Sequence, residues 1–201
     1  MDHRGASGSD PATGDGAGIF VQMPDKFLRK EMAKKDIDLP AEGDYGAGLI
    51  FLSPETSERE AAMQFIEHII REEGQKFLGW RTVPVKSEIL GKTSGRYEPS
   101  IRQVFIGKNP AITDAMEFER TLYIIRRRIT YGIRHNELPN NFTDVHGNKS
   151  NSFPGSSYLY ITNLSARTMV YKGMLTPCQL SEYFPDFHDP DFESALALMH
   201  T

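Results

Sequence analysis

Two helical stripes of apolar residues, flanked by short apolar runs, most constrain the fold of this chain. The first stripe consists of Ala62, Phe65, Ile66, Ile69 and Ile70, and the second of Phe118, Leu122, Ile125 and Ile129. Both stripes recur at steps that place their side chains on one face of a helix. Each helix must therefore bury that face against other elements, which the short runs supply.

Capping residues mark where these two helices begin. Ser57 with Glu60 three residues later has the pattern of a capping box and predicts the start of the first helix. Asp114 and Glu117 predict the start of the second. Shorter amphipathic segments predict further helices at 24–35 and 178–183.

Short runs rich in apolar and β-branched residues predict the strands. They lie at 17–23, 45–52, 79–85, 101–107, 157–165 and 167–173. The last two predict a hairpin with its turn around 164–166, and the polar stretch 136–157 predicts a long mobile surface loop. This order of strands and helices favours an α+β fold with antiparallel sheets.

Composition limits the classes of function. The chain has 201 residues, which suits one globular domain, and a net charge of −4, which argues against a nucleic-acid partner. The run 126–128 of three arginines lies in a helical pattern and predicts a solvated face. No apolar run suggests a membrane helix, and a single cysteine, Cys178, excludes a disulfide framework and favours a cytoplasmic setting.

The glycine-rich stretch 3–20 precedes a strand, and this order decides what it can be. A phosphate-binding loop places its glycines after a strand and before a helix, so the order of residues 3–20 argues against such a loop. A calcium loop would need a closing glutamate after Asp10 and Asp15, which is missing. The remaining interpretation is that Gly14, Gly16 and Gly18 allow backbones to approach closely.

Nucleophile and metal chemistry find little support in the residues. Cys178 follows Pro177 at a short helix and is interpreted as a small buried side chain rather than a nucleophile. The six histidines show none of the spacings typical of metal sites, so no metal is expected.

Seven long motifs, in a fixed order over nearly the whole chain, carry a specific resemblance. They are HRGASGSDPATGDGAGI (3–19), GDYGAGLIFL (43–52), LGWRTVPV (78–85), EPSIRQVFI (98–106), FERTLYIIRRRI (118–129), ARTMVYKGML (166–175) and YFPDFHDPDFESALALMH (183–200). With these motifs the chain resembles the type-2 glutamine amidotransferase domain of the glutamate synthase large subunit.

The resemblance implies an N-terminal-nucleophile hydrolase fold, a four-layer αββα sandwich incomplete at both ends, with 1–201 forming part of the domain. It implies hydrolysis of glutamine to glutamate and ammonia, which a flavin site uses to convert 2-oxoglutarate into glutamate. FMN, an iron-sulfur cluster and an electron-donating subunit or ferredoxin are expected to belong to other regions of the parent protein, and no cofactor is expected in this chain.

The family's nucleophile is a cysteine at the mature N-terminus, whose own amine serves as the base. It is expected upstream of His3, so the chain alone is expected to be inactive. On the resemblance, Arg4, Gly5 and Asp15 help to hold that cysteine and its amine, although Arg4 and Asp15 could equally pair with each other to fix the loop. The alternative is a catalytically dead binding or regulatory module derived from such a domain.

Overall fold

A computed structural model of the chain describes residues 10–134 and 155–200. Arg4 and Gly5 therefore lie outside the described residues. The chain divides into two compact units, which are described separately. The first unit comprises Met1–Asp38, Arg81–Glu98 and Arg167–Thr201, and the second comprises Leu39–Trp80 and Pro99–Ala166.

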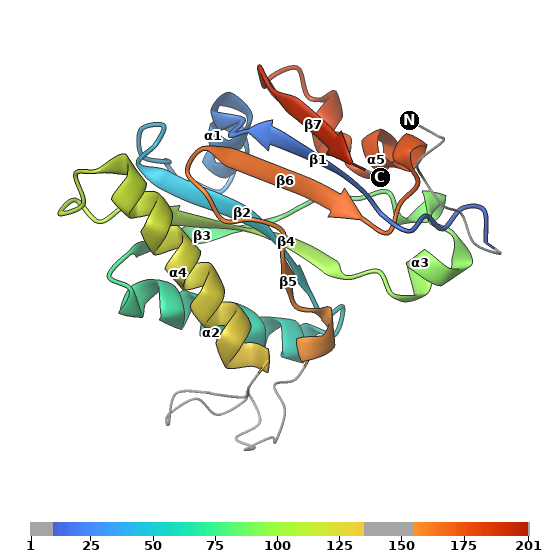
Figure 1. The fold of residues 1–201 in the computed structure, drawn as a ribbon, viewed down its shortest axis with the longest axis horizontal. Helices are drawn as coiled ribbons and strands as arrows, with labels where there is room; N and C mark the ends of the chain where they lie inside the picture. The colour runs from blue at the N-terminus through green and yellow to red at the C-terminus, as the bar shows by residue number, and fades with distance from the viewer. Residues whose placement is uncertain (1–9, 135–154, 201) are drawn as a thin grey trace. The chain divides into compact units, whose positions relative to one another are not determined.

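The second unit is built on an antiparallel sheet with the strand order β3-β4-β2-β5 (Figure 1). These strands are β2 (Tyr45–Leu52), β3 (Lys76–Thr82), β4 (Ser100–Gly107) and β5 (Tyr160–Ile161). β2 pairs antiparallel with β4 from Tyr45 opposite Gly107 to Leu52 opposite Ser100, and antiparallel with β5 on its other side. The helices α2 (Thr56–Glu72) and α4 (Ala115–Arg134) lie side by side against this sheet (Figure 1).

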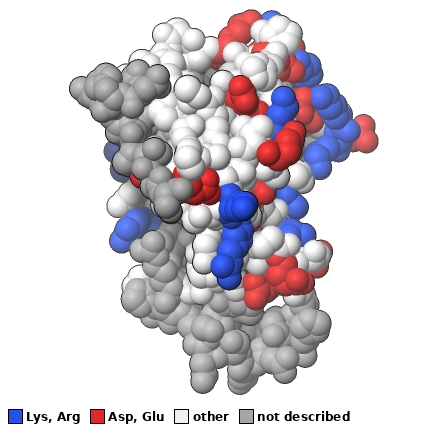
Figure 2. Space-filling view, turned by 90° about the vertical axis from the view of Figure 1, so that its right-hand side faces the viewer, with Lys and Arg blue, Asp and Glu red and all other residues white. Residues whose placement is uncertain are grey.

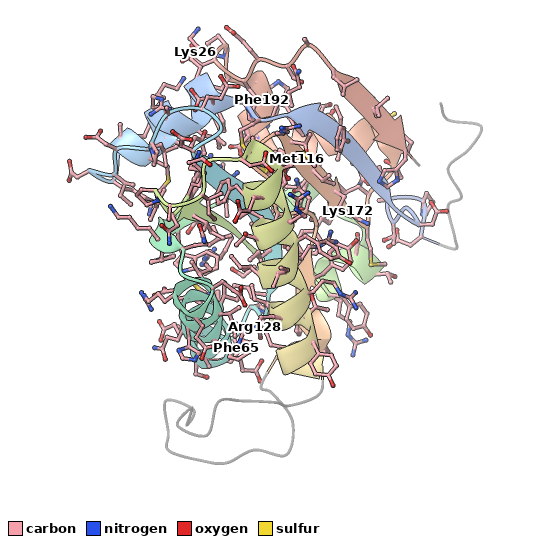
Figure 3. The ribbon with its side chains drawn as sticks, turned by 60° about the vertical axis from the view of Figure 1, so that its left-hand side comes forward. Lys26, Phe65, Met116, Arg128, Lys172 and Phe192 are labelled. Atoms are coloured by element: carbon pink, nitrogen blue, oxygen red, sulfur yellow. The ribbon has the colours of Figure 1, made fainter. Side chains whose placement is uncertain are left out.

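The two apolar stripes form the core of this unit, as their spacing predicts. All nine stripe residues are buried and belong to one cluster with side chains of β2, β4 and β5. Phe65 of α2 lies in this core (Figure 3), and Arg128 of α4 bonds to Glu72 and Glu73 of α2 at 2.6 Å each. The seam between the helices is thus apolar inside and ionic at its rim.

The two predicted caps have different outcomes. The Asp114 carboxylate accepts the Met116 N–H at 3.0 Å, which confirms the start of α4. The capping box at Ser57 is wrong, because α2 begins at Thr56 and Ser57 lies inside its first turn. Ser53 takes part instead: its hydroxyl accepts the Glu55 N–H at 3.1 Å and donates to Glu58 at 2.6 Å.

The first unit contains a three-stranded antiparallel sheet with β1 (Ala17–Gln22) in its centre. β6 (Thr168–Gly173) pairs along the whole of β1, and β7 (Ala197–His200) pairs with Gly18 to Val21 on its other side (Figure 1). The helices of this unit are α1 (Asp25–Ala33), α3 (Lys92–Arg96) and α5 (Pro177–Tyr183). The prediction of an α+β fold with antiparallel sheets is therefore confirmed.

Aromatic rings fill the core of the first unit. The Tyr171 ring lies 5.1 Å from Phe184 and 4.9 Å from Phe187, measured between centroids. The Phe192 ring, which Figure 3 labels, lies 5.3 Å from Phe27 of α1. Edge-on and tilted contacts of this kind are favourable for aromatic pairs.

The predicted hairpin at 157–173 is wrong. β5 pairs with β2 and β6 pairs with β1, so the two strands belong to different sheets. Its supposed turn runs antiparallel to β2 instead, since Ala47 and Ser165 exchange backbone hydrogen bonds at 2.9 and 3.2 Å. Most of the loop predicted at 136–157 falls at 135–154, outside the described residues.

Acidic and basic side chains are interspersed on the face shown in Figure 2. The described part of that face carries no broad patch of a single sign. Among the described helices, none has the length and apolar character needed to cross a membrane.

Candidate functional site

The glycine-rich stretch enters β1 against the backbone that precedes α5. A Cβ atom on Gly14 would lie 2.2 Å from the Leu175 carbonyl oxygen, closer than any side chain can approach. Gly16 has a φ of +144°, a conformation that favours glycine. Close approach of two backbones thus accounts for Gly14, and the backbone conformation for Gly16.

Asp10 anchors the start of this stretch. Its carboxylate accepts the Thr13 hydroxyl at 2.8 Å and the Thr93 N–H of α3 at 3.1 Å. The hydrogen bond from Thr93, followed by that from Thr13, lowers the pKa of Asp10. The Thr13 hydroxyl oxygen in turn accepts the Ser94 N–H at 3.2 Å. The segment is therefore tied to the first turn of α3.

A second set of bonds ties the same segment to α5. The Ala12 carbonyl accepts the Gly91 N–H at 3.1 Å and the Gln179 side-chain amide at 3.0 Å. That amide also donates to the Ile89 carbonyl at 2.7 Å. Three segments distant in sequence thus meet at the beginning of β1, which fixes where β1 starts.

Of the three site residues expected from the resemblance, the structure describes only Asp15. Asp15 is exposed at a bend between Gly14 and Gly16, and its side chain contacts no hydrogen-bond or ion-pair partner among the described residues. A pair between Arg4 and Asp15 is not tested, because Arg4 lies outside the described range.

Asp10, Thr13 and Gln179 were missed as the residues that hold this segment. An Asp followed three residues later by a Thr is a turn signal, and Asp10-Pro11-Ala12-Thr13 carries it. No local signal could have linked Gln179 to Ala12, because their contact spans 167 residues of sequence.

A buried ion pair lies in the core of the same unit. Arg81 donates to both carboxylate oxygens of Asp186 at 2.6 and 2.8 Å, and the Tyr171 hydroxyl donates to Asp186 at 2.9 Å. Burial alone would lower the pKa of Arg81, but the hydrogen bonds and charge of Asp186 outweigh it and raise that pKa. Burial also raises the pKa of Tyr171 well above its ordinary value. Arg81 therefore keeps its charge, and its bonds to Asp186 serve as a structural link.

Cys178 does not provide the nucleophile that the family's chemistry needs. It is exposed on α5, so its interpretation as a buried side chain is wrong. Its amine is part of a peptide bond, whereas an N-terminal nucleophile uses a free amine as its base. Within 10–134 and 155–200, no three His, Cys, Asp or Glu side chains gather as a metal site would require.

Comparison with known proteins adds to this geometry. The model of the family described as glutamine amidotransferases class-II matches residues 1–201. The chain is 42% identical over 202 residues to the glutamate synthase [NADPH] large chain of Bacillus subtilis (strain 168), covering 100% of this chain and 12% of that protein.

Other relatives are similar over the same extent. The chain is 36% identical to the glutamate synthase [NADPH] large chain of Azospirillum brasilense, covering 98% of this chain and 12% of that protein. It is 32% identical to ferredoxin-dependent glutamate synthase 2 of Synechocystis sp. (strain ATCC 27184 / PCC 6803 / Kazusa), with coverages of 100% and 11%. The chain thus spans about a tenth of the length of these curated relatives.

Proposed function

Because this chain belongs to the class-II glutamine amidotransferase family, we propose that it forms part of the glutamine-hydrolysing domain of a glutamate synthase. The match of the family model over all 201 residues is the observation that carries this proposal. The proposed reaction releases glutamate and ammonia from glutamine. The ammonia would then be used by another region of the parent protein to make glutamate from 2-oxoglutarate.

The proposed mechanism uses a cysteine N-terminal to residue 1. Its thiolate attacks the side-chain amide carbon of glutamine, and ammonia leaves as an acyl-enzyme forms. Its free α-amine takes the thiol proton and passes it to the leaving NH2 group, which departs as ammonia. The neutral amine then takes a proton from the water that attacks the acyl-enzyme and returns it to the thiol as glutamate is released. In this scheme the present chain supplies the scaffold: β1 and the anchored segment 10–18 support the strand that carries the cysteine.

Membership of this family also supports a proposal for the architecture of the complete domain. Members of N-terminal-nucleophile families stack two antiparallel sheets between helical layers. The two antiparallel sheets and the helices α2 and α4 against one of them support this arrangement. The four-layer αββα sandwich is therefore the architecture we propose for the complete domain.

The residues of this chain do not fit the cofactors of glutamate synthases. An iron-sulfur cluster needs several cysteine ligands, and the chain has one. The glycine-rich stretch precedes β1 and opens no helix, so it lacks the arrangement in which backbone N–H groups at a helix N-terminus bind a phosphate. FMN, the cluster and the electron donor, whether a subunit or ferredoxin, are accordingly proposed for other parts of the parent protein.

Assays on two lengths of polypeptide test the proposal. The 201-residue chain should release no ammonia from glutamine, whereas a polypeptide from the same gene that begins at an upstream cysteine should release it. In the longer polypeptide, replacing that cysteine by alanine should abolish release, and Cys178→Ala should leave it unchanged. Ammonia release by the 201-residue chain, or a gene without an upstream cysteine, would refute the mechanism, and the latter would favour a non-catalytic module.

Arg4, Gly5 and Asp15 are proposed to position the nucleophile. Arg4→Ala in the longer polypeptide should lower kcat for glutamine hydrolysis while leaving the melting temperature unchanged. Asp15→Asn should act in the same direction, because Asp15 is exposed and has no structural partner among the described residues. Unchanged turnover in both variants would remove these residues from the mechanism.

A further inference from the structure

A cavity of about 220 Å³ opens on the outer side of α4 in the second unit. It lies between this helix and the segment that leads into β5. Its lining consists of Tyr123, Arg126, Arg127, Thr130, Leu159, Tyr160 and Ile161. The lining therefore combines two guanidinium groups, three hydroxyl groups and two aliphatic side chains, without a carboxylate.

The three consecutive arginines of α4 have different partners. Arg128 is neutralised by Glu72 and Glu73, and Figure 3 labels it beside α2. Arg126 donates to the Ile161 carbonyl at 3.1 Å, which fixes its direction but leaves its charge uncompensated. Arg127 is exposed, and neither it nor Arg126 forms an ion pair with any described residue. Two positive charges therefore face one cavity without a counter-charge among the described residues.

The other lining residues would suit a ligand that carries an apolar or aromatic part beside an anionic group. Tyr123 and Tyr160 are 59% and 40% exposed, so both offer accessible ring surface at the cavity. Leu159 and Ile161 add aliphatic surface. The Thr130 hydroxyl already donates to the Arg126 carbonyl at 2.9 Å, so the charged donors that face the cavity are the two guanidinium groups.

We propose that this cavity binds a small organic carboxylate with an aromatic or apolar body. The planar guanidinium group matches a carboxylate through paired hydrogen bonds, and the tyrosine rings provide the flat surface beside it. The volume lies below the usual range of about 300–1,000 Å³ for ligand pockets, which favours a small ligand.

The measurement of this site does not depend on glutamine hydrolysis. Every lining residue belongs to the second unit, whereas the anchored segment before β1 belongs to the first. Binding at the cavity can therefore be measured on the 201-residue chain whether or not the proposed glutaminase chemistry holds.

Titration of the ¹⁵N-labelled chain with sodium benzoate, followed by NMR at constant ionic strength, tests the site. Amide signals of α4 and 159–161 should shift saturably. Arg127→Gln should weaken benzoate binding about tenfold, as expected when one charge-assisted hydrogen bond is lost. Because Arg127 is exposed, this variant should keep the fold, which its own spectrum would verify.

Arg120→Gln is the matched control. It removes the same charge from an exposed position of α4 that does not line the cavity, where Arg120 pairs with Asp114 at 3.3 Å. It should leave benzoate affinity unchanged. Inorganic phosphate, titrated in parallel, should bind more weakly than benzoate because it cannot use the apolar lining. Absence of saturable binding, equal affinity in Arg127→Gln, an equal loss in Arg120→Gln, or phosphate binding as tight as benzoate would each overturn the proposal.

Discussion

Gly14 is the residue at which the anchored segment leaves no room for a side chain. In Gly14→Ala the new Cβ would meet the carbonyl oxygen and carbon of Leu175 at 2.2 and 2.4 Å. These are backbone atoms, so the clash cannot be relieved by a rotamer change. We expect a loss of about 1–3 kcal/mol in the free energy of unfolding, measured by denaturant titration.

Gly95→Ala provides the control for this substitution. Gly95 lies in α3, and the atom nearest to its added Cβ would be the Leu90 Cβ at 3.7 Å, an ordinary contact. Because alanine is favoured over glycine inside a helix, this change should be neutral or slightly stabilising. If Gly14→Ala were equally neutral, the backbone of 10–18 would not approach 175–176 as described.

The protonation of Asp191 should change the stability of the first unit. Hydrogen bonds from Lys26 and then Lys30, with ion-pair distances of 2.8 and 2.5 Å, lower the pKa of Asp191 to about 2. The Asp191 carboxylate binds a proton less readily in the native state than in the unfolded chain. Its ion pairs therefore contribute to the free energy of unfolding above pH 3.8, the ordinary pKa of an aspartate. This contribution should be lost as the pH falls from that value toward about 2.

Melting temperatures of the wild type and Asp191→Asn, compared across this pH range at low salt, measure the effect. The variant should melt below the wild type at neutral pH, and the difference should vanish near pH 2. Added salt should reduce the difference at neutral pH, because Lys26 is exposed and Asp191 is only partly buried. A difference that persists unchanged at low pH would contradict the assignment.

At the scale of elements, the Asp186 carboxylate links the C-terminal end of β3, β6 and the turn Pro185–His188. In Asp186→Ala, Arg81 would keep a buried charge without this partner, and Tyr171 would lose its acceptor. Removing one member of a buried ion pair commonly costs about 3–5 kcal/mol. Denaturant unfolding should therefore show a large loss of stability in this variant.

Asp189→Ala is the matched control, since Asp189 pairs with Lys30 at a more exposed position. It should change stability little, as is usual for surface pairs. The double variant Arg81→Met with Asp186→Leu should recover part of the loss, because it removes both members of the buried pair, while Glu31 loses its 3.3 Å contact with Arg81 and keeps that with Lys34. Equal effects of Asp186→Ala and Asp189→Ala would contradict the role assigned to burial.

The sequence predicted elements that depend on local periodicity and missed pairings that depend on distant contacts. The stripes of α2 and α4 were predicted correctly because burial of one helix face is encoded every three or four residues. The hairpin at 157–173 was wrong because nearness in sequence does not decide which strand β5 and β6 meet. The Ser57 cap failed for a local reason: the helix begins at Thr56, and the hydroxyl that bonds to the backbone before it is that of Ser53.

The anchored segment shows the same limit within the candidate site. Its glycines indicated a close approach, and Gly14 confirms it. The partner surface, formed by 89–94 and 175–179, could not be found from local patterns because it is brought together only by the fold. For the same reason the carboxylate that anchors the segment is Asp10, whereas sequence reasoning singled out Asp15.

At the scale of the whole molecule, β7 is an exposed strand edge that favours association. It is an edge strand of its sheet, all four of its residues are exposed, and Leu198 and Met199 are 59% and 44% exposed. An edge with apolar side chains offers unpaired backbone groups to another chain.

We therefore expect the 201-residue chain to associate as its concentration rises, and Leu198→Lys to reduce this association. The lysine adds charge at the edge and removes an exposed apolar side chain, which natural edge strands also do. Tyr97→Lys, on a residue that is 55% exposed beyond the end of α3, makes a similar change away from any strand edge and should have little effect. Sedimentation velocity over a range of concentrations measures both variants. A wild-type chain that sediments as a monomer throughout, or equal effects of the two substitutions, would show that β7 is not the associating edge.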